Sequence, residues 1–232
     1  MSRYGRRSYY YDDTNYDQKV PKNYNDILAK AVNPVTHSSK KELYNKLCQS
    51  IPIEGGTKIL WLDGSTDKIA IMVSAKALDI IEGFDSRCWQ WVSTQDSRFG
   101  LAAEVKKVEW FEVWQCIDCT LLTPETEYSV SFVLKIEKNS MPTCPSPFTF
   151  SLLTMDGKLI EKAIYLDDHQ KSVTKDKPNI INAEKGWTEF VVGDFVTKES
   201  CDSMEIDVCM KNTDCNFIKR GIVIDGVKIK PK

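Results

Sequence analysis

The sequence predicts an all-β protein, an antiparallel β-sandwich or jelly roll with a helical segment at its N-terminal side. Beyond Gly55 and Gly56 the chain becomes a series of about nine short apolar runs separated by turn residues. The run that starts at Lys68 alternates apolar and other residues, which is typical of a strand with one buried face. No regular alternation of strands with helices follows, so a parallel sheet is not predicted.

Length, charge and the distribution of apolar residues argue against a membrane protein and against a surface that is basic overall. The 232 residues carry a formal net charge of −2, with an isoelectric point near 5.8. A chain of this length buries a core without cross-links, and its charge argues against a surface that is basic overall. We find no apolar run near the roughly 18 residues of a membrane span and no apolar signal segment at the start. We therefore expect a cytoplasmic protein with no membrane partner.

The first 38 residues are predicted to form a flexible extension, and residues 39–232 the folded domain. Residues 1–20 hold five of the nine tyrosines, three arginines and few aliphatic side chains. Such a segment buries too little apolar surface to offset its ordering entropy, so we expect a disordered arm. Its arginine and tyrosine side chains suit contacts with RNA by charge and stacking, but an inert tail is the favoured interpretation. Residues 23–32 predict a short helix.

A second helix is predicted over residues 40–50. Ser39 and Glu42 have the spacing of a capping box, in which the serine caps early amides and the glutamate returns to the cap residue's N–H. Leu43 and Leu47 then form an apolar pair one turn apart. Residues 101–108 fit a helix or a strand, and both remain open. The expected strands lie within residues 58–62, 68–74, 108–117, 128–136, 147–155, 158–166, 187–192, 204–210 and 221–229.

A polar, turn-prone loop stands between two β segments and is the candidate binding site. It carries the acids Glu82 and Asp85, the ring of Phe84 and the cation Arg87. Carboxylates accept hydrogen bonds from hydroxyls and amides, and flat rings stack on the apolar faces of sugars or bases. The tryptophans at 89 and 91 follow on one face of an extended segment. For both of them, a binding role and a place in the core remain open.

The sequence does not resemble that of an enzyme. Its histidines are His37, in a linker, and His169, beside two aspartates in a long polar loop where solvent exposure is the favoured interpretation over metal binding. We find no glycine-rich phosphate loop, nucleophile elbow or HExxH sequence, and expect no cofactor and no metal.

Eight cysteines invite two interpretations. Cys116 and Cys119 form a CxxC pair inside a β-like run, where packed strand residues are favoured over redox or zinc chemistry. Cys201 and Cys215 stand in polar loops. Intermolecular cross-linking through these two thiols after oxidation is an open possibility.

From Lys58 to its end the chain resembles the phloem protein 2 family, plant lectins of the Nictaba type. Six ordered blocks carry the resemblance: KILWLDGSTDKIAIMVSAKALDI, SRCWQWV, SRFGLAAEVKKVEWFEVWQCI, LTPETEYSVSFVLKI, GWTEFVVGDF and RGIVIDGVKIKPK. The resemblance implies a jelly-roll sandwich of the carbohydrate-binding-module type and binding of N-acetylglucosamine oligomers or N-glycan cores. It also implies residence in the cytoplasm or phloem sap, formation of a homodimer and no catalysis.

The same resemblance assigns roles to single residues. Trp89 stands where the family has its binding-associated tryptophan, while Glu82 replaces a frequent tryptophan. Ile218 and Lys219 stand where the family commonly has Trp-Lys, so the lysine is kept and the ring is lost. We expect a shallow cleft at one end of the sandwich, in which Trp89 walls the sugar, the acids accept hydrogens and Lys219 donates from the opposite side. The alternative is a structural or carrier phloem protein with a decayed sugar site, which binds RNA or is cross-linked to phloem-filament proteins.

Overall fold

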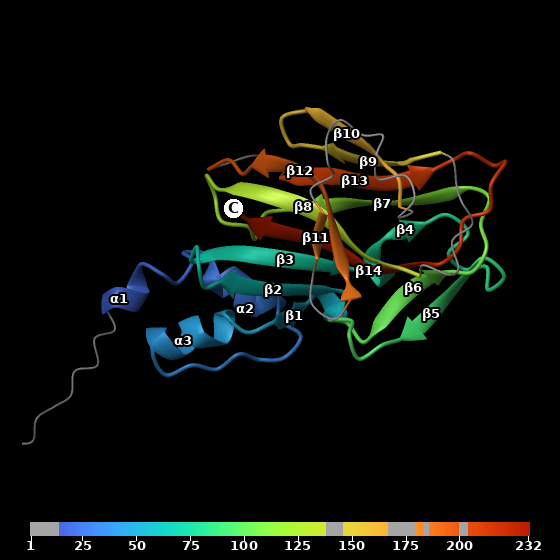
Figure 1. Cartoon of the computed structure of the whole chain (residues 1–232). Helices are drawn as coiled ribbons and strands as arrows, with labels where there is room; N and C mark the ends of the chain where they lie inside the picture. The colour runs from blue at the N-terminus through green and yellow to red at the C-terminus, as the bar shows by residue number, and fades with distance from the viewer. Residues whose placement is uncertain (1–13, 138–145, 167–179, 183–185, 200–203) are drawn as a thin grey trace, which may run out of the picture.

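The computed structural model describes residues 14–137, 146–166, 180–182, 186–199 and 204–232. Two antiparallel sheets pack face to face, with the helices gathered beside one end of the larger sheet (Figure 1). This arrangement confirms the predicted all-β sandwich. No helix in the described part of the chain is long and apolar enough to cross a membrane.

In the described residues the larger sheet has nine strands and the smaller sheet has five. The larger sheet follows the order β1 (Ile51–Ile53), β2 (Lys58–Asp63), β3 (Lys68–Ser74), β14 (Ile222–Pro231), β8 (Glu127–Ile136), β12 (Thr188–Val196) and β11 (Ile180–Asn182), with β6 (Leu101–Val105) on β14 and β5 (Trp89–Ser93) on β6. The smaller sheet follows the order β10 (Leu159–Ile164), β9 (Phe148–Leu153), β13 (Glu205–Asn212), β7 (Phe111–Asp118) and β4 (Asp79–Ile80). Residues 101–105, which the sequence left open, are therefore a strand.

Strand β14 is the centre of the larger sheet because it pairs with β3, β6 and β8. Its register against β8 shifts between Ile224 and Gly226, and Gly226 has φ +157°. A Cβ atom at Gly226 would lie 1.9 Å from the carbonyl oxygen of Val73. Only glycine lets β14 approach β3 this closely at the irregular position.

Aromatic rings fill the space between the sheets. Phe111 packs edge-on against Phe148 with ring centroids 5.2 Å apart, and Phe132 meets Phe150 at 5.7 Å. All four rings are buried. These contacts join β7 to β9 and the smaller sheet to the larger one.

Three helices precede the sandwich: α1 (Thr14–Asp17), α2 (Tyr24–Lys30) and α3 (Lys40–Leu47). Two 3₁₀ turns, η1 (Glu54–Gly56) and η2 (Ala75–Ala77), follow β1 and β3. The predicted cap of α3 is present, since the Glu42 N–H donates to Ser39 Oγ at 3.2 Å. The Glu42 carboxylate, however, accepts from the N–H and hydroxyl of Ser38 rather than from Ser39, at 2.8 and 2.6 Å. Leu43 and Leu47 are fully buried, as their spacing predicts.

Part of the segment expected to be flexible lies against the sandwich. Residues 1–13 are outside the described range, but Val20 and Ile27 are buried, Ile27 completely. Asn23 Nδ2 donates to the carbonyl of Leu121, and the Val32 N–H donates to that of Pro52 at 2.9 Å. Within residues 14–20, α1 is helical and Val20 is buried in the core, so this end of the expected arm contacts the folded domain. The flexible extension itself stays a prediction. A domain boundary at residue 38 stays a prediction.

Candidate functional site

The candidate loop connects β4 to β5 and is closed by its own backbone. The Gly83 N–H donates to the carbonyl of Ile80, and the Asp85 N–H to that of Glu82 at 2.8 Å. The carbonyl of Asp85 then accepts from the N–H groups of Cys88 and Trp89, both at 2.9 Å. Glu82 takes the left-handed backbone conformation, with φ 58°, to make the tight turn. The side chains of Glu82 and Arg87 are exposed, and that of Asp85 is partly buried.

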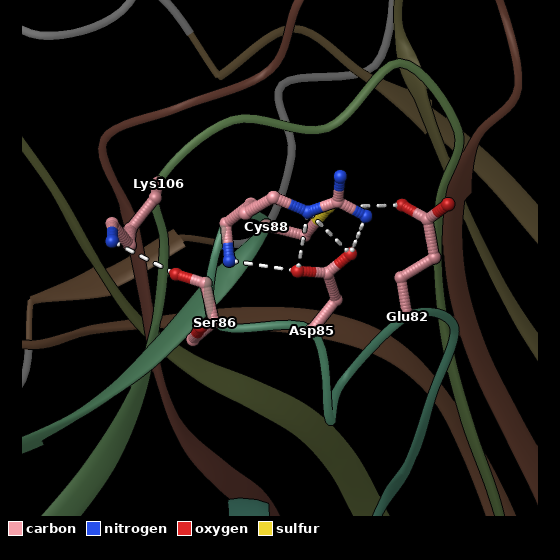
Figure 2. Close-up of polar contacts among 6 residues, drawn as sticks. Glu82, Asp85, Ser86, Cys88 and Lys106 are labelled. Carbon is pink, nitrogen blue, oxygen red and sulfur yellow. Dashed lines mark hydrogen bonds and ion pairs between the residues drawn. The ribbon is translucent and has the colours of Figure 1, made fainter.

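Polar contacts order the side chains of this loop (Figure 2). Arg87 Nε donates to Asp85 Oδ1 at 3.0 Å, and Arg87 Nη2 donates to Oδ2 at 2.6 Å. These hydrogen bonds from Arg87 lower the pKa of Asp85 to about 2. The thiol of Cys88 donates to Glu82 Oε2 at 3.2 Å; burial first, and then this carboxylate, raises the pKa of the thiol. At physiological pH the loop presents a paired carboxylate and guanidinium beside Glu82.

Lys106 ties the loop to the segment that follows β6. Its ammonium donates to the carbonyl of Ser86 at 2.8 Å (Figure 2). Its backbone N–H donates to the carbonyl of Cys88 at 2.9 Å. The sequence analysis did not identify this lysine, since it lies 20 residues from its partner and belongs to no local pattern. It adds a second cation to the loop surface.

Four of the six predicted site residues are brought together by this loop: Glu82, Phe84, Asp85 and Arg87. Phe84 is fully exposed, with no side chain of the described residues covering its ring. The remaining two, Trp89 and Lys219, are buried in the protein.

Trp89 belongs to the core. Its side chain is 4% exposed, its ring packs against Phe111 at 5.7 Å, and its Nε1–H donates to the carbonyl of Ile81 at 3.1 Å. An indole held in this way has no face available for a sugar, so the expectation that Trp89 walls the site is wrong. Trp91, on the next position of the same strand face, is 44% exposed. The two tryptophans differ because the smaller sheet covers only the first of them.

Lys219 is a structural lysine. Its side chain is 1% exposed, and its ammonium donates to the carbonyls of Glu109, at 2.6 Å, and Asp214. Its backbone exchanges two hydrogen bonds with Val108, at 2.7 and 3.0 Å. A buried ammonium needs such acceptors to offset its desolvation. Lys219 therefore fastens the loop before β14 to the segment before β7 and does not face a ligand across a cleft, which corrects the expected geometry.

Two further exposed tryptophans were missed. Trp110 and Trp114 are 46% and 42% exposed, and they stand immediately before and within β7. The signal was present in the alternation of residues 110–114, where Phe111 and Val113 form the buried face and the two tryptophans share the other with Glu112.

The cysteines show no cross-link among the described residues. Cys116 and Cys119 are free, and burial, the first cause in each case, raises their pKa values to about 11 and about 12. Such thiols are poor nucleophiles and poor metal ligands. Within the described ranges no group of three or more metal-ligating side chains is found. Cys215 is free and exposed, whereas Cys201 and His169 lie outside the described residues.

The family model and the curated relatives point to one family. The model of the family described as Phloem protein 2 matches residues 68–231. The chain is 31% identical over 233 residues to F-box protein PP2-A15 of Arabidopsis thaliana, covering 94% of this chain and 76% of that relative. It is 32% identical to F-box protein PP2-A13 of the same plant, covering 94% and 74%. Among solved structures, the mannan-recognising carbohydrate-binding module TmCBM27 aligns at 10% identity with a TM-score of 0.33, over 67% of this chain and 84% of that chain.

Proposed function

Because this chain belongs to the phloem protein 2 family, we propose that it is a carbohydrate-binding phloem protein that works without catalysis. Its ligands are N-acetylglucosamine oligomers or the cores of N-glycans, free or on glycoproteins. The observation that carries the proposal is the family match over residues 68–231, which includes strands of both sheets and the whole candidate loop. In this proposal the protein acts in the cytoplasm or phloem sap, as a homodimer and without a cofactor.

The chemistry of the candidate loop supports this ligand class. An N-acetylglucosamine unit offers hydroxyls, an amide N–H, an amide carbonyl and one apolar ring face. Glu82 and Asp85 provide acceptors, and the Arg87 guanidinium provides donors. Phe84 adds an uncovered ring. The internal hydrogen bonds of the loop hold these groups in place before a ligand arrives, which reduces the entropic cost of binding.

Calorimetric titration of the folded protein with tri-N-acetylchitotriose tests the proposal, with cellotriose, which lacks the acetamide groups, as the ligand control. We expect the acetylated trimer to bind and Phe84→Ser to weaken binding without lowering the melting temperature. Val196→Ala, at another exposed apolar position, serves as the protein control. A folded protein that shows no response to millimolar oligosaccharide, and none on a glycan array, contradicts the proposal.

A second candidate function rests on Cys215, an exposed free thiol. Under this alternative the protein is a structural phloem protein that oxidation links to filament proteins, and its arm binds RNA. Non-reducing gels of the oxidised protein should show oligomers that Cys215→Ser, alone or with Cys201→Ser, removes. RNA binding should weaken with added salt and disappear when residues 1–20 are deleted. Monomers on such gels, with no shift of labelled RNA, would leave only the lectin function.

A further inference from the structure

The outer face of the smaller sheet carries a row of exposed aromatic and acidic side chains that are not part of the candidate loop. Along β7 the side chains of Phe111, Val113 and Ile117 are buried between the sheets. Alternation therefore places Glu112 and Trp114 on the opposite, outer face. Trp114 is 42% exposed there, although a tryptophan is normally covered when it lies in the middle of a strand.

Trp110 extends this line. Its indole Nε1–H donates to Glu112 Oε2 at 2.9 Å, which places the Trp110 ring on the same face as Glu112. Three residues stand between the two tryptophans, which for extended chain corresponds to at most about 13 Å between their Cα atoms. We call Trp110, Glu112 and Trp114 the β7 tryptophan track. Its length exceeds that of one sugar ring.

The charges around the track are mainly negative. In the register of the sheet, Trp114 lies between Asp79 on β4 and Cys209 on β13, and Glu112 lies opposite Lys211. The outward charged positions of the five strands include six acids and one lysine: Asp79, Glu112, Asp118, Glu161, Glu205, Asp207 and Lys211. Such a face repels the phosphates of a nucleic acid and repels a second copy of itself. It does not repel an uncharged ligand that donates hydrogen bonds.

The track also joins the candidate loop. Ile81, the first residue of the loop, donates its N–H to the carbonyl of Glu112 at 3.1 Å, directly after the pairing of β4 with β7. Ile81 is itself 40% exposed. The loop that carries Phe84 and Arg87 thus begins at the edge of the track.

We propose that the β7 tryptophan track binds consecutive units of a neutral, N-acetylated sugar chain, one end of which meets the candidate loop. This inference rests on the proposed carbohydrate-binding function and names the surface that gives it chain-length selectivity. The two indoles bury the apolar faces of separate sugar units, while Glu112 and Asp79 accept hydrogen bonds from hydroxyl and amide groups. The track supplies the aromatic surface that buried Trp89 does not.

Titration with the mono- to tetrasaccharide series of N-acetylglucosamine tests this inference in Trp114→Ala and Trp110→Ala. We expect each variant to bind the tetrasaccharide about tenfold more weakly or worse, and to lose the gain in affinity with chain length. Trp91→Ala is the matched control, because Trp91 is equally exposed but lies on the other sheet. Trp91→Ala should bind like the unmodified protein. The melting temperatures of the three variants show whether each of them is folded.

A measurement on the unmodified protein covers the case in which a variant does not fold. Oxidation by N-bromosuccinimide, followed by peptide mass spectrometry, reports each exposed tryptophan. The tetrasaccharide should protect Trp110 and Trp114 and leave Trp91 reactive. If oligosaccharide binds but protects neither residue of the track, the inference is overturned while the lectin function stands. If no oligosaccharide binds at all, both are overturned.

Discussion

Trp89 and Lys219 stabilise the two loops that lead into β5 and β14. The indole of Trp89 packs against Phe111 and holds the candidate loop at Ile81 by one hydrogen bond. The ammonium of Lys219 satisfies two carbonyls that belong to separate segments, one of them 110 residues away in sequence. Both side chains position polar loops from within the protein. Their physical role is to restrict the motion of loops whose exposed side chains belong to other residues.

At this scale we predict that Trp89→Ala reduces the free energy of unfolding by about 3–5 kcal/mol. The substitution removes a large buried ring and leaves a cavity beside Phe111. Urea unfolding followed by circular dichroism measures the effect. Trp91→Ala, at an exposed position of the same strand, should change stability by less than about 0.5 kcal/mol. A Trp89→Ala variant that keeps its stability but loses glycan binding would contradict this prediction and show that Trp89 contacts the ligand.

At the scale of elements, β14 determines the larger sheet. It pairs with three strands, and its irregular position at Gly226 brings its backbone against Val73 of β3. β3 continues through η2 to β4, which joins the smaller sheet directly before the candidate loop. A disturbance at Gly226 is therefore expected to reach the start of that loop.

We predict that Gly226→Ala destabilises the protein by about 3 kcal/mol or more, since the new methyl group meets a backbone oxygen and an alanine is strained at this φ. Thermal unfolding monitored by circular dichroism measures the loss. Gly64→Ala is the control, because a Cβ atom there has no neighbour within 4 Å and φ is not positive. Equal melting temperatures for the two variants would show that β14 and β3 separate at this point without cost.

At the scale of the whole molecule, the helical segment and the sandwich form one packed unit in the described residues. Ile27 of α2 and Leu43 of α3 are fully buried in the same core as the sheet residues. The Lys30 ammonium also lies 3.8 Å from the carboxylate of Asp118 at the end of β7. This packing places α1 to α3 away from the β5–β6 end of the sandwich, so the candidate loop is left uncovered by them (Figure 1).

The matching prediction is that Ile27→Ala lowers the free energy of unfolding by about 2–4 kcal/mol, as expected for a buried aliphatic side chain. Val32→Ala, at a position that is 49% exposed, should have little effect. Chemical denaturation of the full chain distinguishes them. If both variants have the stability of the unmodified protein, residues 14–38 contribute nothing to the fold and the flexible extension reaches residue 38 as the sequence predicted.

Much of the fold could be predicted because its signals are local. The spacing of Ser39 and Glu42 predicted where α3 begins, and the apolar runs predicted the positions of most strands. Alternation predicted one buried face for residues 68–74, which is wrong: β3 is buried on both faces, because Met72 packs into a second cluster with Trp187. The polar loop between β4 and β5 was also visible, since turn residues with acids and an arginine cannot continue a strand. The same alternation separates Phe111 and Val113 from Trp110 and Trp114, so even the β7 tryptophan track is contained in the sequence pattern.

Burial of single side chains at the ends of strands was decided by the tertiary structure alone. Trp89 and Trp91 share one face of β5, and only the reach of the smaller sheet makes the first a core residue and the second a surface residue. From the sequence Lys219 is expected to be a surface cation, but the fold places two carbonyls within hydrogen-bond distance of its ammonium. The alternation of side chains along a strand depends only on residues that are neighbours in the chain, so the sequence by itself determines it. The surroundings of a side chain depend on segments that are distant in the chain, which only the packed molecule brings together.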